Sequence, residues 1–197
     1  MPRPEIHTLD HLLDSARQLV LEGGARAVTI DGLVAASGSP KGSIYHRFAT
    51  LDDLLATMWL RALRRSQLGF LAALDRLARD PVETAVAAGL SLHDFAAEQP
   101  ADARLLASMR REDLLGSVSA PEVGEGLRHA NVELKRGIDE LARALYGRAS
   151  RSAIERTMLV TVDLPYGAVR RHLGGSGPIP RSVRVQLEAA MRAALAA

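Results

Sequence analysis

The chain has 197 residues, of which 47% are hydrophobic, with 25 Lys and Arg against 23 Asp and Glu and no Cys. This composition suits one or two globular domains with a sizeable core, and it excludes a disulfide framework, a zinc site built on Cys and a thiol nucleophile. A net charge of +2 is too small to indicate nucleic-acid binding by itself, and charged residues interrupt every apolar stretch before it could span a membrane, so we expect a soluble cytoplasmic protein with no membrane partner.

Apolar residues recur at helical spacing from the first residues onward. The first helix is predicted over residues 8–23, directly before a glycine. A short second helix has Thr29 as its N-cap and Gly38 just past its end. Ser39 is expected to cap a third helix whose first helical position is Pro40. Further helices are predicted over residues 51–79, 81–98, 101–115, 121–146, 151–173 and 181–197.

The predicted helix over residues 151–173 contains Pro165. Proline has no N–H and its ring clashes with the carbonyl group four residues earlier, so we expect a bend here and a free carbonyl group at residue 161. No segment alternates apolar and polar residues over the length of a strand, and no repeat is visible. The predicted fold class is therefore all-α.

The segment 29–50 carries the strongest functional signal. Two short helices that meet at Gly38 are what a helix-turn-helix requires, in which the second helix enters the major groove of DNA. No carboxylate occurs between Asp31 and Asp52, and Gly42 would let a nucleic acid approach the helix closely. The same stretch carries side chains that can donate hydrogen bonds to phosphates and base edges: Lys41, Ser43, Tyr45, His46 and Arg47.

At these residues the sequence resembles a known family. Residues 8 to about 60 are similar to the N-terminal DNA-binding domain of TetR/AcrR-type transcriptional regulators, and the likeness covers about a quarter of the chain. The positions of this chain that match the family pattern are Thr29, Leu33, Gly38, Gly42, Ser43, Ile44, Tyr45 and Phe48.

The resemblance implies a homodimeric all-α regulator, usually a repressor. An N-terminal three-helix helix-turn-helix domain is expected over residues 1–50. A C-terminal helical domain over 51–197 is expected to bind a small-molecule effector and to dimerise through its last two helices. The implied partners are a double-stranded DNA operator, an effector that the sequence does not identify, and a second copy of the chain.

The resemblance also assigns roles to single residues. Leu51 stands where the family usually has a Lys that binds a phosphate, and Ser39-Pro40 replaces the usual turn residues, which would weaken the backbone contacts or shift them to Arg47 and Arg3. The residues expected to contact DNA are Thr29, Lys41, Gly42, Ser43, Tyr45, His46 and Arg47.

The second domain offers two further sets of candidates. Apolar pockets with a few polar groups are typical ligand sites, and Tyr166 beside the predicted bend is the candidate polar contact. The candidate ligand-pocket residues are Trp59, Phe95, Met109, Met158 and Tyr166. The candidate dimer-interface residues are Met158, Val162, Val169, Leu187, Met191 and Leu195.

No catalytic residue, metal site or cofactor is predicted. The six His are scattered, no H-E-x-x-H pair occurs, and the chain lacks the G-x-S-x-G motif of a nucleophile elbow. The sequence therefore predicts a DNA-binding regulator rather than an enzyme, most simply a repressor that releases a near-palindromic operator when it binds its ligand. The alternative is a helical small-molecule-binding or interaction protein whose helix-turn-helix no longer binds DNA specifically.

Overall fold

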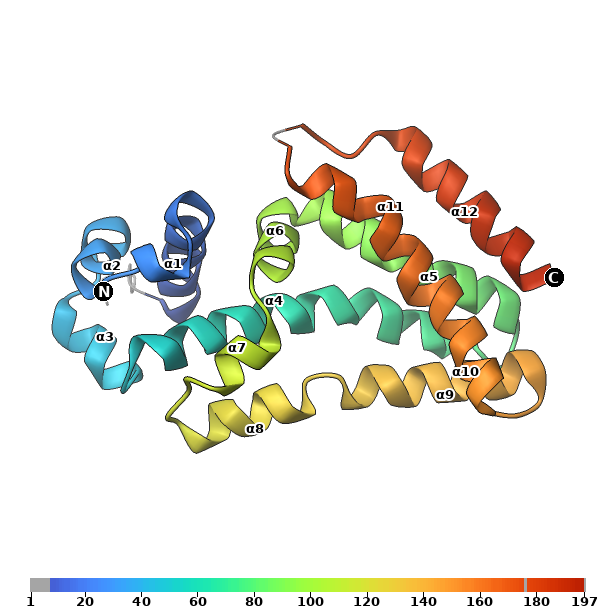
Figure 1. The fold of residues 1–197 in the computed structure, drawn as a ribbon, viewed down its shortest axis with the longest axis horizontal. Coiled ribbons are helices and arrows are strands. Elements are labelled where there is room, and N and C mark those ends of the chain that lie inside the picture. Colours follow the sequence, from blue (N-terminus) through green and yellow to red (C-terminus); the bar gives the residue numbers. More distant parts are fainter. Residues whose placement is uncertain (1–7, 176, 197) are drawn as a thin grey trace, which may run out of the picture. The chain divides into compact units, whose positions relative to one another are not determined.

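The computed structural model describes residues 8–175 and 177–196, and every regular element in these ranges is a helix (Figure 1). The predicted all-α class is therefore confirmed. Arg3, to which a DNA-backbone contact was assigned, lies outside the described residues. In the same described ranges, no helix combines the length and the hydropathy that crossing a membrane would take.

Short 3-10 helices and one π-helical turn interrupt the series of α-helices. In chain order the elements are α1 (Leu9–Gly23), η1 (Ala25–Ala27), α2 (Ile30–Ser37), α3 (Lys41–Arg47), α4 (Leu51–Ala73), η2 (Leu74–Arg76), α5 (Pro81–Glu98), α6 (Pro100–Ser108), α7 (Arg111–Leu115), α8 (Pro121–His129), α9 (Val132–Tyr146), α10 (Arg151–Met158), the π-helical turn η3 (Leu159–Asp163), α11 (Leu164–Leu173) and α12 (Arg181–Ala196).

The chain divides into two compact units. Unit 1 combines the chain up to Leu63 with Arg104–Ala130, and unit 2 combines Arg64–Ala103 with the chain from Asn131 onward. Helices α4 and α6 therefore each contribute residues to both units. The assignment of Arg104–Ala130 to the N-terminal helices is a feature that the sequence did not indicate. The predicted boundary after residue 50 concerns function, and it stays a prediction.

Unit 1 is built around one hydrophobic core to which all its helices contribute. The apolar stripe of α1 supplies Leu13, and α2 and α3 supply Leu33 and Ile44, so that the three short N-terminal helices share one interior. The buried residues that the later helices add to this core include Met58, Trp59, Leu105, Leu114 and Leu127.

The ends of the first helices follow from their capping residues. The hydroxyl oxygen of Thr29 accepts a hydrogen bond from the Gly32 N–H at 3.0 Å, and Gly38 ends α2 in the left-handed region with φ 67°. The predicted cap at Ser39 is wrong. Pro40 precedes α3 with ψ 141° and no side-chain cap, while buried Ser39 donates its N–H to the Ser37 hydroxyl at 3.1 Å.

Two predicted helices are each divided in the structure. The helix predicted over 101–115 is interrupted at Arg110, which has the extended values φ −102° and ψ 140°. The helix predicted over 121–146 is interrupted at Asn131. Its N-terminal part packs into the core of unit 1 and its C-terminal part into unit 2, so two different cores bury one continuous apolar pattern.

The bend expected at Pro165 takes the form of a π-helical turn, η3. The Leu164 N–H donates to the carbonyl oxygen five residues earlier, at Leu159, which widens the helix just before the proline ring. Pro165 itself is buried in the first turn of α11. The chain therefore continues from α10 through η3 to α11, as Figure 1 shows in orange.

Candidate nucleic-acid interface

Helix α3 is held in unit 1 by one face. Ile44 is 1% exposed in the core, and Phe48, directly after the helix, packs against the same core. Because α3 is only two turns long, this anchoring fixes which side chains point outward. The outward residues, all exposed, are Lys41, Gly42, Ser43, Tyr45, His46 and Arg47.

The exposed surface of α3 therefore contains six of the seven residues expected to contact DNA. The side chain of Tyr45 is 54% exposed, which is a high value for an aromatic residue. The seventh candidate, Thr29, is also exposed, but its hydroxyl oxygen already caps α2. The structure brings these residues to the surface of unit 1, and their contact with DNA stays a prediction.

Lys41 has an intramolecular partner. Its ammonium group lies 3.2 Å from a carboxylate oxygen of Asp31, and both side chains are more than half exposed. Ion pairs of this kind contribute little, so a phosphate could replace Asp31 at small cost. Leu51 is half-buried against the core of unit 1, where it cannot supply the phosphate contact of the lysine that is usual at this position.

Gly42 is the second residue of α3, and the fold shows no structural reason for a glycine there. A Cβ atom built there would have no other atom within 4 Å, and the residue does not have a positive φ. Glycine destabilises a helix by up to about 1 kcal/mol relative to alanine. Gly42 therefore lowers the stability of the helix at a position where a larger side chain would fit.

Acidic side chains attach α4 to other helices of unit 1 at two places: Asp10 and Asp14 bind Arg61, and Asp53 binds the residues before α8. Arg61 on α4 donates hydrogen bonds to Asp10 and Asp14 of α1, at 2.7 and 2.5 Å. No local sequence pattern indicates these contacts, because the residues are about fifty positions apart. They attach the first helix of unit 1 to α4.

Asp53 forms the second attachment, and it is 1% exposed. One carboxylate oxygen accepts hydrogen bonds from the Ser119 and Ala120 N–H groups, both at 2.9 Å. The other accepts from the hydroxyl groups of Ser119 and Thr50, both at 2.7 Å. Burial raises the pKa of Asp53, but these hydrogen bonds outweigh it and lower the pKa to about 2. The carboxylate thereby joins the start of α4 to the start of α8.

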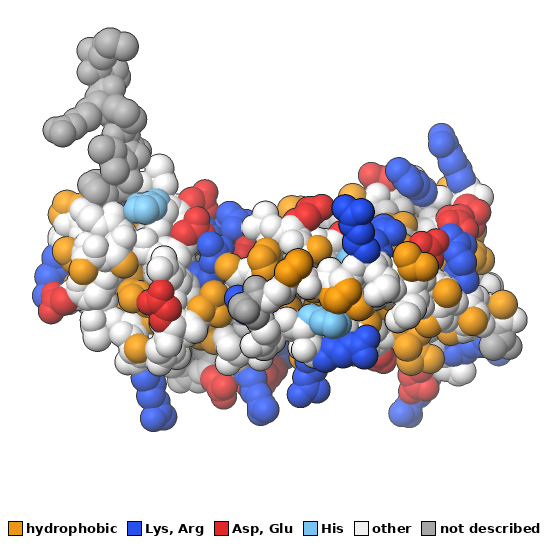
Figure 2. Space-filling view, turned by 90° about the horizontal axis from the view of Figure 1, so that it is seen from above, with side chains coloured by type: hydrophobic (Ala, Val, Ile, Leu, Met, Phe, Trp, Pro, Cys, Tyr) orange, Lys and Arg blue, Asp and Glu red, His pale blue; other side chains and the backbone are white. Residues whose placement is uncertain are grey.

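The face drawn in Figure 2 shows blue basic side chains interspersed with red acidic ones. Over the described part of this face, no large area of a single sign is present. This face agrees with the small net charge of +2, which is too small for a general positive potential, so DNA binding would depend on the local arrangement around α3.

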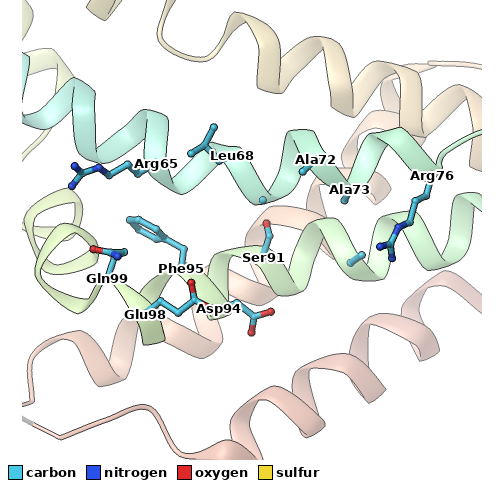
Figure 3. A pocket seen from close by; sticks show the side chains of 12 residues that line it. Arg65, Leu68, Ala72, Ala73, Arg76, Ser91, Asp94, Phe95, Glu98 and Gln99 are labelled. Atoms are coloured by element: carbon cyan, nitrogen blue, oxygen red, sulfur yellow. The ribbon is translucent and has the colours of Figure 1, made fainter.

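Unit 2 contains a cavity of about 630 Å³ between the C-terminal part of α4 and α5 (Figure 3). A site of this volume suits a small organic ligand. Of the five predicted pocket residues, Phe95 lines this cavity. Trp59 and Met109 belong to the core of unit 1 instead, and Met158 and Tyr166 are exposed, so the structure does not bring the five together.

The candidate dimer residues divide into two groups. Leu187 and Met191 of α12 are buried within the protomer against α5 and η3, and Val169 of α11 is buried too. They are therefore core residues of unit 2 and cannot also face a second copy. Val162 and Leu195 are half-buried and Met158 is exposed. Other exposed apolar residues on the same helices are Leu159, Tyr166 and Val185.

Comparison with known proteins agrees with this arrangement. Residues 12–58 match the family model described as bacterial regulatory proteins, tetR family. No curated protein matches the sequence.

Several solved structures share the fold. The TetR family transcriptional regulator PfmR from Thermus thermophilus is 18% identical, covering 94% of this chain and 97% of that chain with a TM-score of 0.68. The ketosteroid transcriptional regulator KstR2 of Mycobacterium tuberculosis is 16% identical, covering 95% and 93% with a TM-score of 0.69. A TetR transcriptional regulator from Agrobacterium tumefaciens is 22% identical, covering 95% and 92% with a TM-score of 0.59.

The helix-turn-helix and the surrounding helices have the architecture found in solved structures of transcriptional regulators. Residues 12–58 are similar to the tetR family of bacterial regulatory proteins, and the fold of the described chain is similar to that of solved TetR-family regulators. The predicted resemblance is confirmed. The solved structures compared above are all described as transcriptional regulators.

Proposed function

We propose that this protein is a transcriptional repressor that binds a near-palindromic operator as a homodimer and releases it when a small molecule binds unit 2. The observation that carries the proposal is the surface of α3, where one buried anchor orients six exposed residues outward without any carboxylate among them. Gly42 supports it further, because a helix that approaches a DNA backbone has a use for a missing side chain.

Binding to both halves of a near-palindromic operator requires a second copy of the chain. Two recognition helices roughly 34–36 Å apart enter successive major grooves on one side of the duplex. The exposed apolar residues Leu159, Tyr166 and Val185 of the C-terminal helices support a dimer interface there, since exposed apolar patches on a protein surface commonly mark interaction sites. A regulator of this kind acts on genomic DNA, so we place it in the bacterial cytoplasm.

The cavity in unit 2 is the proposed effector site. A ligand with different affinities for two conformations shifts the equilibrium between them, and coupling of this kind is typically worth about 1–3 kcal/mol. Helix α4 contributes residues to this cavity and, in its N-terminal part, to the core beside the recognition helix. A change in α4 is therefore the proposed route from effector to operator.

The test is a titration of the purified protein against the DNA upstream of its own gene and against a scrambled duplex, at two salt concentrations. Selective binding whose affinity falls steeply with salt is expected, because phosphate contacts release counterions. Equal, weak binding to both duplexes across the neighbouring intergenic regions would contradict the proposal.

A second function is favoured by two observations. Leu51 packs in the core instead of reaching a phosphate, and Lys41 already pairs with Asp31. Both fit a ligand-binding or interaction protein that retains the helix-turn-helix only as structure. The salt dependence separates the two functions, since this alternative predicts no specific, salt-sensitive DNA complex.

A further inference from the structure

The cavity between α4 and α5 has a floor of small residues. Gly69 and Ser91 meet so closely that a Cβ atom on Gly69 would lie 2.7 Å from the Ser91 Cβ atom. Ala72 and Ala87 also line the cavity. Leu68 and Phe95 are larger apolar lining residues, and Figure 3 shows both toward the end opposite Arg76. The middle of the cavity therefore offers a shallow apolar surface on which an extended, unbranched chain can lie.

Two of the charged residues that line the cavity are already engaged. Asp94 accepts hydrogen bonds from Arg184 of α12 through both carboxylate oxygens, at 2.9 and 3.2 Å. Arg65 donates to the buried carboxylate of Asp102 at 3.1 Å. Removing either charge from its partner to bind a ligand would cost a charge-assisted hydrogen bond. Neither residue is therefore the preferred contact for a charged ligand.

The other two lining charges, Arg76 and Glu98, are exposed. Within the described part of the chain, neither side chain has a hydrogen-bond or ion-pair partner. They lie at opposite ends of the cavity in Figure 3, with Arg76 beyond Ala73 and Glu98 beside Gln99. On α5, Ala87 and Glu98 are eleven residues apart, which at the helical rise corresponds to about 16 Å.

We propose that this cavity binds an elongated dipolar molecule: an anionic group at the Arg76 end, an unbranched apolar chain over the small-residue floor, and an ammonium group at the Glu98 end. The inference deepens the proposed effector site and rests on it. It follows from the placement of one unengaged charge of each sign at the two ends of an apolar floor. A ligand with a single charge satisfies one end, and a ligand with two like charges is repelled at the other.

The probes for the test are ω-aminododecanoic acid, dodecanoic acid and dodecylamine, titrated calorimetrically into the full-length protein below their aggregation concentrations. All three share the apolar chain and differ in their terminal charges at neutral pH. The dipolar acid is expected to bind about two- to fivefold more tightly than either singly charged probe, since one additional contact with an exposed charged side chain is worth roughly that factor.

Two substitutions test which charged group of the ligand binds at each end of the cavity. Arg76→Ala is expected to weaken the binding of both probes that carry a carboxylate about two- to fivefold and to leave the binding of dodecylamine unchanged. Glu98→Gln is expected to weaken both probes that carry an ammonium group and to leave dodecanoic acid unchanged. Arg79→Ala removes an exposed arginine three residues beyond Arg76 that does not line the cavity, and it serves as the matched control.

Equal affinity for the three probes, no binding of the dipolar probe, or equal effects of Arg76→Ala and Arg79→Ala would each overturn the proposal. The DNA titration separates this failure from failure of the proposed function. If charge selectivity is absent while specific DNA binding is present, only the ligand class is wrong. If the predicted selectivity appears without specific DNA binding, the ligand class stands and the proposed regulator function fails.

Discussion

Gly42 is a residue that the fold of this protein does not require. Its position in α3 is open and its φ is ordinary, so alanine would fit. We expect Gly42→Ala to raise the free energy of unfolding by about 0.5–1 kcal/mol and to lower the affinity for the operator, because the added methyl group would meet the DNA. Urea unfolding and the DNA titration measure the two effects. A stabilised variant with undiminished DNA affinity would show that α3 does not closely approach DNA.

A substitution of Lys41 provides a second test of DNA contact by a single residue of α3. Replacing it with alanine should weaken binding to all DNA sequences to a similar degree and reduce the slope of log K against log salt by about 1, as the loss of one phosphate contact requires. Asp31→Asn is the matched control, because it removes the partner of Lys41 and leaves the lysine free for DNA. An unchanged salt slope in Lys41→Ala would exclude a phosphate contact by this residue.

Asp53 links protonation to stability. The pKa of its carboxyl group is lowered to about 2 in the folded protein, compared with 3.8 for an unperturbed Asp. Because the folded state binds this proton more weakly, the stabilisation is complete above about pH 5 and is lost as the pH falls toward 2. The size of the shift corresponds to about 2 kcal/mol at neutral pH.

We therefore expect Asp53→Asn to lower the free energy of unfolding by about 1–2 kcal/mol at pH 7, since the amide retains only part of the hydrogen bonding. The difference from the wild type should disappear near pH 2. Asp52→Asn, at the exposed neighbouring position, is the control. Urea unfolding at several pH values checks this, and a difference that stays constant between pH 7 and pH 2 would contradict the assigned role of the carboxylate.

Among the elements, α5 and the π-helical turn η3 depend on each other at Gly89. A Cβ atom at this buried position would lie 2.6 Å from the Met191 sulfur atom and 3.0 Å from the Val160 carbonyl oxygen. The backbone of the turn can approach α5 this closely because Gly89 has no side chain. The widened turn before Pro165 and the glycine on α5 are thus two parts of one packing arrangement.

Gly89→Ala should consequently destabilise unit 2 by about 1–3 kcal/mol, the usual cost of overpacking a core, despite the higher helix propensity of alanine. Thermal unfolding followed by circular dichroism measures it. Gly42→Ala, the same substitution at an open helical position, should have the opposite sign. Equal stabilisation by both substitutions would mean that α5 and η3 separate easily.

For the whole molecule, two sets of ion pairs hold α12 on α5. Arg184 binds Asp94, and Arg192 donates to Glu83, with one contact at 2.9 Å, and to Glu188. Burial raises the pKa of Asp94, but the hydrogen bonds and charges of Arg184 and His93 together outweigh burial and lower this pKa. With Leu187 buried beneath, the inner face of α12 is used within the protomer, and its outer face is left for a partner.

Substitutions on the outer and the inner face of α12 therefore test the proposed dimer interface. Val185→Glu changes a residue that is 69% exposed and should dissociate the dimer while leaving the protomer folded. Leu187→Glu places a charge at a residue that is 4% exposed and should unfold unit 2. Light scattering reports the mass and circular dichroism the fold. A Val185→Glu protein that keeps twice the protomer mass would exclude this face as the interface.

The sequence by itself determined the helical class, the ends of α1 and α2, and the outward residues of α3. These features depend on interactions within one or two helical turns: the cap at Thr29, the left-handed Gly38, and a single buried position at Ile44. A side chain on so short a helix either enters the core or faces away from it, so the pattern of apolar and polar residues was sufficient to predict which residues of α3 face outward.

Only the tertiary structure decided which surface covers each apolar face. Periodicity reveals that a helix has such a face but not what it packs against, so residues 121–146 looked like one helix although two cores share them. For the same reason Leu187 and Met191 looked like interface residues and are core residues instead. The contacts of Asp53, and the cavity between α4 and α5, join residues distant in sequence, and no local pattern specifies them.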